Sequence, residues 1–407
     1  MTTPAMKVLT PIRPAARLDE VRYAIRDLAV LADEVAKQGT KILPLNIGDP
    51  LKFDFATPPH LVEAVYKAMR DGRNGYSPSS GTPEAVEAIR HEAERKGITN
   101  VLDAFVTSGA SEAVDICLNA LLNSDENVLC PEPEYPLYTA VVAKMGLKPN
   151  SYALNEENGW QPDFEDIERK ITPKTRGLVF INPNNPTGAI YSRETLERLA
   201  EIADRHNLVI FADEIYDKLV LEGQHISLAA IAPDVPVVTF GGMSKNYLAP
   251  GWRIGWGIVS GPKEITQPYV DGINKLLRSR LCASHPMMYA IKPALEGPQG
   301  HLVEVMAKLR SRRDLTMKWA RETPRVSCVE PQGAFYAYPK LDIPEPDEDF
   351  VKKLLKETGV LLVHGSGFGQ APGTKHARIV FLPNEQTLTA AYAQIAQFMQ
   401  RHYSQLR

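Results

Sequence analysis

The sequence predicts an α/β protein with a mostly parallel central sheet, helices on both faces of that sheet, and a second, smaller α+β domain. Between residues 100 and 260, short apolar runs alternate with segments of helical periodicity, which is the pattern of a doubly wound sheet. After residue 300 this alternation ends, and a long helix, several β-runs and further helices follow. We place the large domain at 51–298 and the small domain at 1–50 together with 299–407.

Composition narrows the function classes. A chain of 407 residues has room for about two or three domains, and 44% hydrophobic with 23% charged residues is ordinary for a globular enzyme. The net charge of -3 and the absence of a basic run argue against nucleic acid and anionic membranes as partners. No apolar run is long enough to cross a bilayer, and the N-terminus lacks the apolar core of a signal peptide.

Cysteine and histidine usage indicates the compartment of the protein and argues against a metal site. The four cysteines are scattered, none forms a C-x-x-C pair, and they read as reduced thiols of a cytoplasmic protein. The nine histidines show no spacing typical of metal ligands, so we expect no metal.

The first hundred residues contain two candidate ligand positions. A helix at about 18–38 and a β-run at 41–47 are expected, and the run stops at Gly48. A glycine there lets a ligand approach the backbone, although, taken alone, it is better explained by a plain turn after the strand. A helix from 58 to 72 and a turn-rich segment follow. Tyr76 in that segment is either a surface aromatic or a phenol placed to bind an anion.

Two predicted strands then end in loops suited to a ligand. The strand 104–107 breaks at small residues, including Gly109, Ala110 and Ser111, before a helix begins. Free N–H groups and the helix dipole hold phosphate at such a position, but Ser111 also makes an ordinary helix cap. The strand 127–130 leads into a proline-rich loop that presents Tyr135 at the sheet edge where ligands of open α/β sheets bind.

The next two strands carry polar groups at their carboxyl ends. The apolar strand 177–181 ends in the turn Asn-Pro-Asn-Asn-Pro-Thr-Gly, which includes Asn185. The strand 208–212 ends in Asp-Glu-Ile-Tyr, which begins at Asp213 and closes at Tyr216. A carboxylate at the end of an apolar strand is partly desolvated and must find a cation or an N–H donor, or become neutral.

The strand 235–240 ends at two glycines, and Ser244, Lys245 and, eight residues past the lysine, Arg253 follow. Burial lowers the pKa of a lysine, and a neutral amine can form a Schiff base with an aldehyde. Because Ser244 and Arg253 suit a phosphate, the expected aldehyde is pyridoxal 5'-phosphate. Taken alone, this stretch is better explained by a solvated lysine after a strand.

The rest of the chain adds one more candidate cation. A strand at 253–259 completes the large sheet, a helix spans 263–278, and Arg280 lies in the loop after it. The small domain is expected to hold a helix at 301–322, antiparallel strands at 326–329 and 334–339, a polar linker at 344–349, a β-run at 360–364 and a last strand at 376–382 that carries Arg378.

These separate signals agree on one cofactor. The pyridine nitrogen of pyridoxal phosphate needs a buried carboxylate to stay protonated, its phenolate oxygen needs donors, its ring needs a flat neighbour, and its phosphate needs amides and a cation. Asp213 is the candidate for the nitrogen, Asn185 and Tyr216 for the phenolate oxygen, and Tyr135 for the ring face. Lys245 is the candidate for the aldehyde. The candidates for the phosphate are Gly109, Ala110, Ser111, Ser244 and Arg253.

The chain also resembles a known family, the class I/II aminotransferases, over nearly its whole length. The motifs are Asn-Asn-Pro-Thr-Gly at 184–188, Asp-Glu-Ile-Tyr at 213–216, Ser-Lys-Asn at 244–246 and Gly-Trp-Arg-Ile-Gly-Trp at 251–256. The segments 45–50, 75–81 and 280–282 are similar to the alanine (glutamate–pyruvate) branch. The resemblance implies the fold type I of pyridoxal-phosphate transferases and a homodimer with active sites at the subunit interface.

The resemblance also implies roles for individual residues. Tyr76 is expected to reach the cofactor phosphate of the neighbouring subunit, and Arg378 to clamp the substrate α-carboxylate with help from Gly48 and Asn185. Tyr23 stands where that branch has a tyrosine near the substrate. For a dicarboxylate substrate Arg280 is a candidate second cation, although it can equally cap a helix or pair at the interface.

Several functions remain open at this point. The expected reaction moves an amino group from alanine to 2-oxoglutarate, but aspartate or aromatic amino acids are alternative donors. A C–S lyase or a decarboxylase uses the same cofactor groups on the same fold. A pyridoxal-phosphate-binding regulator without catalysis is less expected, because no helix-turn-helix extension or basic arm is present. A cofactor-free Ser-Lys hydrolase is the remaining alternative.

Overall fold

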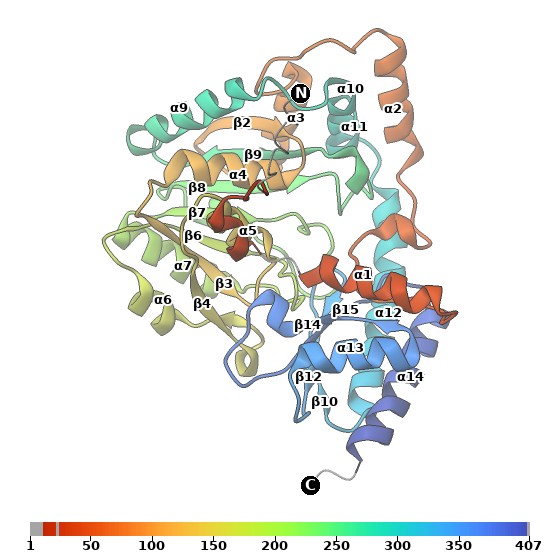
Figure 1. The fold of residues 1–407 in the computed structure, drawn as a ribbon. Helices are drawn as coiled ribbons and strands as arrows, with labels where there is room; N and C mark the ends of the chain where they lie inside the picture. Colours follow the sequence, from red (N-terminus) through yellow and green to blue (C-terminus); the bar gives the residue numbers. More distant parts are fainter. Residues whose placement is uncertain (1–10, 22–23, 405–407) are drawn as a thin grey trace, which may run out of the picture.

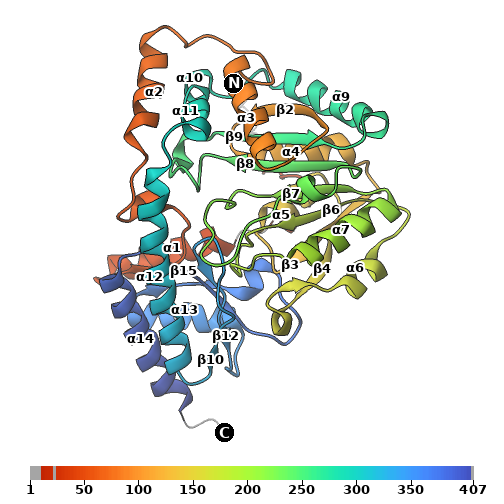
Figure 2. The same ribbon diagram turned by 180° about the vertical axis from the view of Figure 1, so that it is seen from behind.

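The computed structural model describes residues 11–21 and 24–404. The chain builds a large part around one eight-stranded sheet and a smaller part around three short sheets, as Figures 1 and 2 show from opposite sides. The predicted α/β class, the mostly parallel sheet and the smaller α+β part are therefore confirmed.

The large sheet has the strand order β2-β9-β8-β7-β6-β3-β4-β5. The pairs from β4 through β3, β6 and β7 to β8 are parallel, whereas β9 runs antiparallel to both of its neighbours and β5 to β4. The strands are β2 (Val101–Thr107), β3 (Asn127–Glu132), β4 (Asn150–Asn155), β5 (Gln161–Pro162), β6 (Thr175–Ile181), β7 (Val209–Asp213), β8 (Val237–Gly242) and β9 (Gly255–Ser260).

Helices cover both faces of this sheet because its strands are apolar on both faces. In β6, for example, Leu178 and Phe180 join one apolar cluster, and Val179 and Ile181 join the other. The first face packs against α3 (Pro83–Arg95), α6 (Phe164–Lys170), α7 (Arg193–His206) and α8 (Leu228–Ile231); the second packs against α4 (Ala110–Leu121), α5 (Leu137–Lys144) and α9 (Lys263–Ser279).

The helix α7 shows how local sequence sets these elements. The Ser192 side chain accepts a hydrogen bond from Thr195 N and caps the start, while Asn207 adopts φ 53° and ends the helix. Apolar Leu196 and Leu199 are fully buried on its inner face. These local signals set the bounds of the helix at Arg193–His206.

The small part is assembled from distant segments of the chain. The helix α12 (Gly300–Glu322) runs from the large part down into it, where it packs beside α14 (Glu385–Tyr403) (Figures 1 and 2). Its other helices are α1 (Ala24–Lys37) and α13 (Asp347–Thr358). Its sheets pair β1 (Leu43–Pro44) with β13 (Val360–Leu361), β10 (Val326–Ser327) with β12 (Lys340–Leu341), and β15 (Ala377–Val380) with both β11 (Tyr336–Ala337) and β14 (Val363–His364).

Three predicted details of the small part are wrong. The segments 326–329 and 334–339 do not pair with each other, because β10 bonds to β12 and β11 to β15. The expected linker 344–349 already contains the start of α13, since the buried carboxylate of Asp347 accepts hydrogen bonds from Ser366 and Gln370 and holds that helix in place. The single helix predicted at 18–38 is, in its described part, a 3₁₀ turn (Ala16–Glu20) followed by α1.

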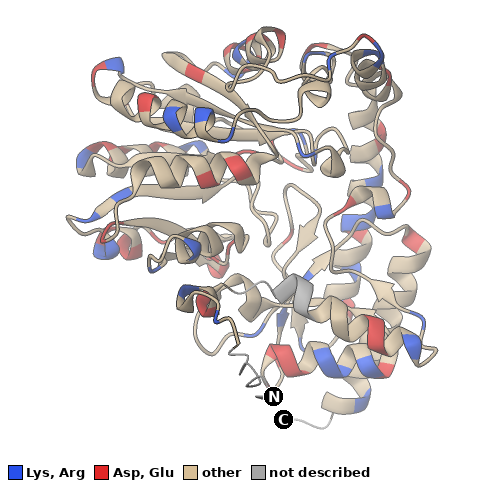
Figure 3. Cartoon of the chain, turned by 45° about the horizontal axis from the view of Figure 1, so that its top comes forward, with Lys and Arg blue, Asp and Glu red and all other residues tan. Residues whose placement is uncertain are grey.

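The remaining helices lie at the edge of the large part, where α2 (Pro59–Arg70) packs on α10 (His285–Met288) and α11 (Ile291–Glu296). Lysines and arginines are interspersed with aspartates and glutamates along the helices visible in Figure 3. Within residues 11–21 and 24–404, no helix combines the length and apolar character needed to span a membrane.

Candidate active site

A cavity of about 450 Å³ lies at the carboxyl ends of β6, β7 and β8, where the large sheet meets β11 and β15 of the small part. Parallel strands deliver their carboxyl ends to the same edge, which is why segments far apart in sequence meet here. The predicted residues that line this cavity are Gly48, Ala110, Ser111, Tyr135, Asn185, Asp213, Tyr216, Ser244, Lys245, Arg253 and Arg378.

Lys245 follows the end of β8 and points into the cavity. Its Nζ donates a hydrogen bond to the carbonyl oxygen of Gly48 at 2.8 Å, so the amine bridges from the large sheet to the small part. Burial lowers the pKa of Lys245 to about 8, and the positive charge of Arg378 acts in the same direction. Near neutral pH a useful fraction of this amine is therefore uncharged and nucleophilic.

Asp213 ends β7 and is 5% exposed. Its Oδ2 accepts a hydrogen bond from the Tyr138 hydroxyl at 2.9 Å, and its Oδ1 accepts one from Ile215 N at 3.3 Å. Burial raises the pKa of Asp213 to about 6, against the lowering effect of the Tyr138 hydrogen bond. A buried carboxylate of this kind is suited to hold a protonated heteroaromatic nitrogen.

Asn185 and Arg378 meet on the small-part side of the cavity. Arg378 is 1% exposed, and its Nη1 donates to the side-chain oxygen of Asn185 at 3.2 Å. Its Nη2 donates to the backbone oxygen of Asn46. The guanidinium lies 4.8 Å from the ring centre of Tyr336 and 4.6 Å from that of Phe368. A planar cation fixed between two rings presents its fork of donors in one orientation, which suits a carboxylate.

The other end of the cavity is built for an anion. Gly109 precedes α4 with φ 84°, and a Cβ at this position would lie 2.3 Å from Nη2 of Arg253. Only a glycine therefore allows the guanidinium to lie over the N-terminus of α4, where Ala110 and Ser111 supply backbone N–H groups without helical partners. The helix dipole and the arginine together favour a phosphate here.

Three of the described residues that were predicted for the site do not line the cavity. Gly109 lies directly behind it, under Arg253. Tyr76 is 83% exposed on the single chain. Arg280 pairs with Glu112 at 3.4 Å and donates to the backbone oxygen of Val106, and it does not line the cavity. Tyr23 lies outside the described residues.

Two tyrosines of the site were missed by the sequence reading. Tyr138 lies in the first turn of α5, whereas Tyr135 precedes that helix, so no helical spacing links the two tyrosines in the sequence. Tyr336 lies on β11, and its hydroxyl is 2.8 Å from the hydroxyl of Tyr216. Only the pairing of β11 with the strand of Arg378 brings Tyr336 to the cavity, and no spacing in the sequence predicts that pairing.

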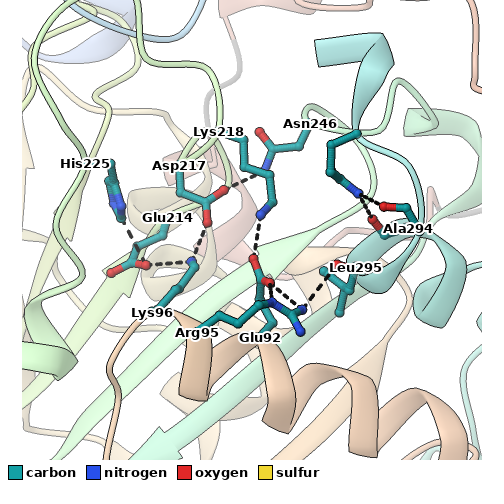
Figure 4. A network of polar contacts seen from close by, with 12 residues as sticks. Glu92, Arg95, Lys96, Glu214, Asp217, Lys218, His225, Asn246, Ala294 and Leu295 are labelled. Carbon is teal, nitrogen blue, oxygen red and sulfur yellow. Dashed lines mark hydrogen bonds and ion pairs between the residues drawn. The ribbon is translucent and has the colours of Figure 1, made fainter. Parts of the chain in front are cut away.

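Behind the cavity, a buried network of charged side chains fixes the two loops that carry the site (Figure 4). Lys96, just after α3, contacts the carboxylates of Glu214 and Asp217. Asp217 also accepts a hydrogen bond from Asn246 at 2.6 Å. Glu214 directly follows Asp213, and Asn246 directly follows Lys245, so the network ties together the backbones of both cavity residues.

Comparison with known proteins identifies the class. The family model for aminotransferase class I and II matches residues 40–395. The chain is 38% identical to the glutamate-pyruvate aminotransferase AlaA of Escherichia coli (strain K12), covering 97% of this chain and 100% of that protein. It is 41% identical to the alanine aminotransferase of Mycobacterium tuberculosis (strain ATCC 25618 / H37Rv), covering 95% and 92%.

A solved structure agrees with these relatives. The alanine aminotransferase from Pyrococcus furiosus superposes with a TM-score of 0.92 at 42% identity, covering 96% of this chain and 100% of that one. The chain therefore belongs to the class I and II aminotransferase family, whose cofactor is pyridoxal 5'-phosphate. The cavity fits this group: it offers a buried carboxylate, an amine of lowered pKa and an arginine over a helix N-terminus.

Proposed function

We propose that this protein transfers the amino group of L-alanine to 2-oxoglutarate, giving pyruvate and glutamate. The observation that carries the reaction type is the cavity itself, where the amine of Lys245, the carboxylate of Asp213 and the guanidinium of Arg378 converge. The choice of alanine rests on full-length relatives at about 40% identity that are named for glutamate, pyruvate or alanine.

In this proposal, each part of the cofactor is bound by its own set of side chains. Asp213 would hold the pyridine nitrogen, and its carboxylate would keep that nitrogen protonated. Lys245 would bind the aldehyde carbon. Asn185 and Tyr216 would contact the phenolate oxygen and Tyr135 the ring face, while the phosphate would be held by Gly109, Ala110, Ser111, Ser244 and Arg253. The bound cofactor supplies an electron sink for the negative charge that develops at the substrate Cα.

The chain's own groups then bind the substrate and move one proton. Arg378 receives the α-carboxylate in a bidentate manner, with Asn185 and the Gly48 backbone beside it. The amine of Lys245, freed when the amino group of the substrate takes its place, would accept the proton from Cα as a general base and hold it for return as a general acid. A pKa of about 8 suits both steps, because neither the charged nor the neutral form of the amine dominates overwhelmingly near neutral pH.

A screen of half-reactions tests this function. Each amino acid is mixed with the cofactor-loaded protein, and loss of the visible cofactor absorbance is followed; pyruvate or 2-oxoglutarate is then added to restore it. We expect alanine and glutamate to bleach the band fastest. Faster bleaching by aspartate or aromatic amino acids would correct the substrate, and release of ammonia with pyruvate would indicate a lyase. A band that no amino acid bleaches would contradict the proposal.

We also propose that the protein acts as a cytoplasmic homodimer. Tyr76 is 83% exposed, and α2 beside it exposes Val62, Tyr66 and Met69, an apolar face that a second copy would cover. In the dimer Tyr76 reaches the cofactor phosphate of the partner subunit. All four cysteines are free, in keeping with a reducing compartment.

The division into domains stays a proposal as well, with 51–298 as the large domain and 1–50 with 299–407 as the small one. The parallel pairing of Leu43 with Val360 and of Pro44 with Leu361 supports the assignment of the first fifty residues to the small domain. The 3₁₀ turn at Ala16–Glu20 lies against the large part instead, since Arg17 donates to the Lys144 backbone oxygen at 3.0 Å.

A further inference from the structure

The side chain of Tyr336 is held rigidly at the junction of the two parts. It is 2% exposed, and its ring lies under the guanidinium of Arg378. Its hydroxyl fills the space beside Gly48, where an added Cβ would lie 2.3 Å from the phenolic oxygen. The same hydroxyl is 2.8 Å from that of Tyr216, whose loop follows β7 of the large sheet. The orientation of Tyr336 is therefore fixed from three sides.

Two hydroxyls that share one hydrogen bond have a direction, because only one of them donates to the other. If Tyr216 donates to Tyr336, its proton is used inside the protein and is not available to the cavity. If Tyr336 donates instead, the Tyr216 proton is free to point at whatever occupies the cavity, which both residues line.

We propose that Tyr336 is a positioning residue for the cofactor: it donates its proton to Tyr216 and thereby directs the Tyr216 proton toward the phenolate oxygen of the ring. This inference rests on the proposed function, in which Tyr216 contacts that oxygen. The hydroxyl of Tyr336, from the small part, would donate to the hydroxyl of Tyr216, which in turn would donate to the negative ring oxygen. Two hydrogen bonds in series polarise and strengthen each other.

The charges around the pair favour this direction. Burial raises the pKa of Tyr336 to about 12, and Arg378 opposes that rise. Burial also raises the pKa of Tyr216, and the carboxylate of Asp213 adds to that rise. The cation beside Tyr216, Nζ of Lys245, lies 6.0 Å from the centre of its ring, whereas Arg378 lies 4.8 Å from the ring centre of Tyr336. A hydroxyl beside a cation is the better donor, so the proton between the two oxygens belongs to Tyr336.

The test is a pH titration of the visible absorption band of the bound cofactor in the Tyr336→Phe enzyme. This band reports the proton shared between the ring oxygen and the nitrogen of Lys245, and every donor to the oxygen lowers the affinity for that proton. Loss of the Tyr336 donor should raise the midpoint by about half a pH unit to one unit, the size expected for one weakened hydrogen bond.

Tyr338→Phe is the matched control. Tyr338 lies two residues further along, is 1% exposed, and donates to the backbone oxygen of Gly365 at 2.9 Å. It does not line the cavity. This variant also loses one buried hydroxyl hydrogen bond, but its midpoint should equal that of the wild type. Tyr336→Leu, which lacks the hydroxyl and packs as an aliphatic group, should shift the midpoint in the same direction as Tyr336→Phe and covers the case that the phenylalanine variant does not fold.

Tyr216→Phe separates the inference from the proposed function. If Tyr216→Phe raises the midpoint and Tyr336→Phe leaves it unchanged or lowers it, Tyr336 is not the donor and the inference is overturned, while the function stands. If the wild-type protein binds pyridoxal phosphate without any visible band that sodium borohydride removes, the proposed function fails and the inference fails with it.

Discussion

Two buried groups of charges lie next to each other in this protein and behave in opposite ways. In the network behind the cavity, burial opposes the charge of Lys96, but the carboxylates of Asp217 and Glu214 overcome this and raise its pKa. Burial likewise opposes the charge of Asp217, yet Lys96 brings its pKa down to about 2. In the cavity, by contrast, burial raises the pKa of Asp213, which lies four residues before Asp217, to about 6. Burial also lowers the pKa of Lys245 to about 8.

The pKa shifts differ in direction because the opposite charges of the network touch each other, whereas Lys245 and Asp213 do not form an ion pair. Lys96 touches its carboxylates directly, so each charge stabilises the other. The hydrogen bonds of Lys245 and Asp213 go to a backbone oxygen and to a tyrosine hydroxyl, neither of which carries a full charge. Buried groups that are pushed toward neutrality and face a cavity mark a functional site. The network thus contributes to stability, whereas the cavity residues are arranged for binding and proton transfer.

The largest effect is expected for Lys96→Met. Removal of one partner leaves Glu214 and Asp217 buried without their cation, which costs about 3–5 kcal/mol of unfolding free energy. Urea unfolding of the purified protein measures this loss. Lys318→Met is the control, because Lys318 is an exposed surface residue for which we expect a change within about 0.5 kcal/mol. A loss below about 1 kcal/mol for Lys96→Met would show that the network is not a source of stability.

Asp213→Asn is expected to raise the unfolding free energy of the cofactor-free protein, which is the opposite of the effect of Lys96→Met. The folded-state pKa of Asp213, about 6, lies above the ordinary value of 3.8, so the folded protein binds more protons between these values and loses stability as pH rises through that range. Asp213→Asn removes this loss and should raise the unfolding free energy at pH 7 by up to about 3 kcal/mol.

Asp217→Asn is the matched control for this prediction. The folded-state pKa of Asp217, about 2, lies below the ordinary 3.8, so its contribution to stability is present above pH 4 and is lost as pH falls toward 2. The same substitution four residues away should therefore destabilise the protein at pH 7. If both variants shift the unfolding free energy in the same direction, the contrast between cavity and network is wrong.

Arg378→Lys should affect substrate binding rather than stability. The charge is retained, but the planar fork between Tyr336 and Phe368 is lost, and with it one hydrogen bond to a charged carboxylate. We expect kcat/KM for alanine to fall about 30- to 100-fold, mostly through a higher KM. Arg325→Lys, on a surface arginine that bonds to Asp342, should leave both constants unchanged. An unaltered KM in Arg378→Lys would contradict the proposal that Arg378 binds the substrate carboxylate.

The smallest effect is expected for Tyr76→Phe. If its hydroxyl reaches the cofactor phosphate of the partner subunit, its loss should weaken cofactor affinity about tenfold, the value of one hydrogen bond to a charged group. Tyr66→Phe, which keeps the ring of the α2 face that a second copy would cover and loses only a hydroxyl, should not change that affinity. Equal cofactor dissociation constants for the wild type and Tyr76→Phe would contradict the proposed cross-subunit contact.

Sequence reasoning reached the parts of this site that depend on local order. Asp213 is the last residue of an apolar strand, and Lys245 and Asn185 lie in the loops just after two others. A parallel sheet brings such strand ends together whatever the details of packing. Tyr336 and Lys96 could not be found in this way. Tyr336 reaches Tyr216 across 120 residues and Lys96 reaches Glu214 across 118, so both contacts depend on how whole elements dock.

The small part was harder to predict for a related reason. Its strands are only two to four residues long, so alternation of apolar side chains carries little information about partner or register. The segment 334–339 was expected to pair with its neighbour in sequence, but it pairs with β15 instead. That pairing places Arg378 and Tyr336 side by side, and it therefore matters more for the site than any other strand contact of the small part.

The central claim is that the amine at position 245 is the one that holds the cofactor, and reductive labelling tests it most directly. The protein is loaded with pyridoxal phosphate, treated with sodium borohydride and digested, and the peptides are analysed by mass spectrometry. We expect the phosphopyridoxyl group on the peptide that contains Lys245, and no labelled peptide from Lys245→Ala. Labelling of a different lysine in the wild type, with Lys245 unmodified, would contradict the account.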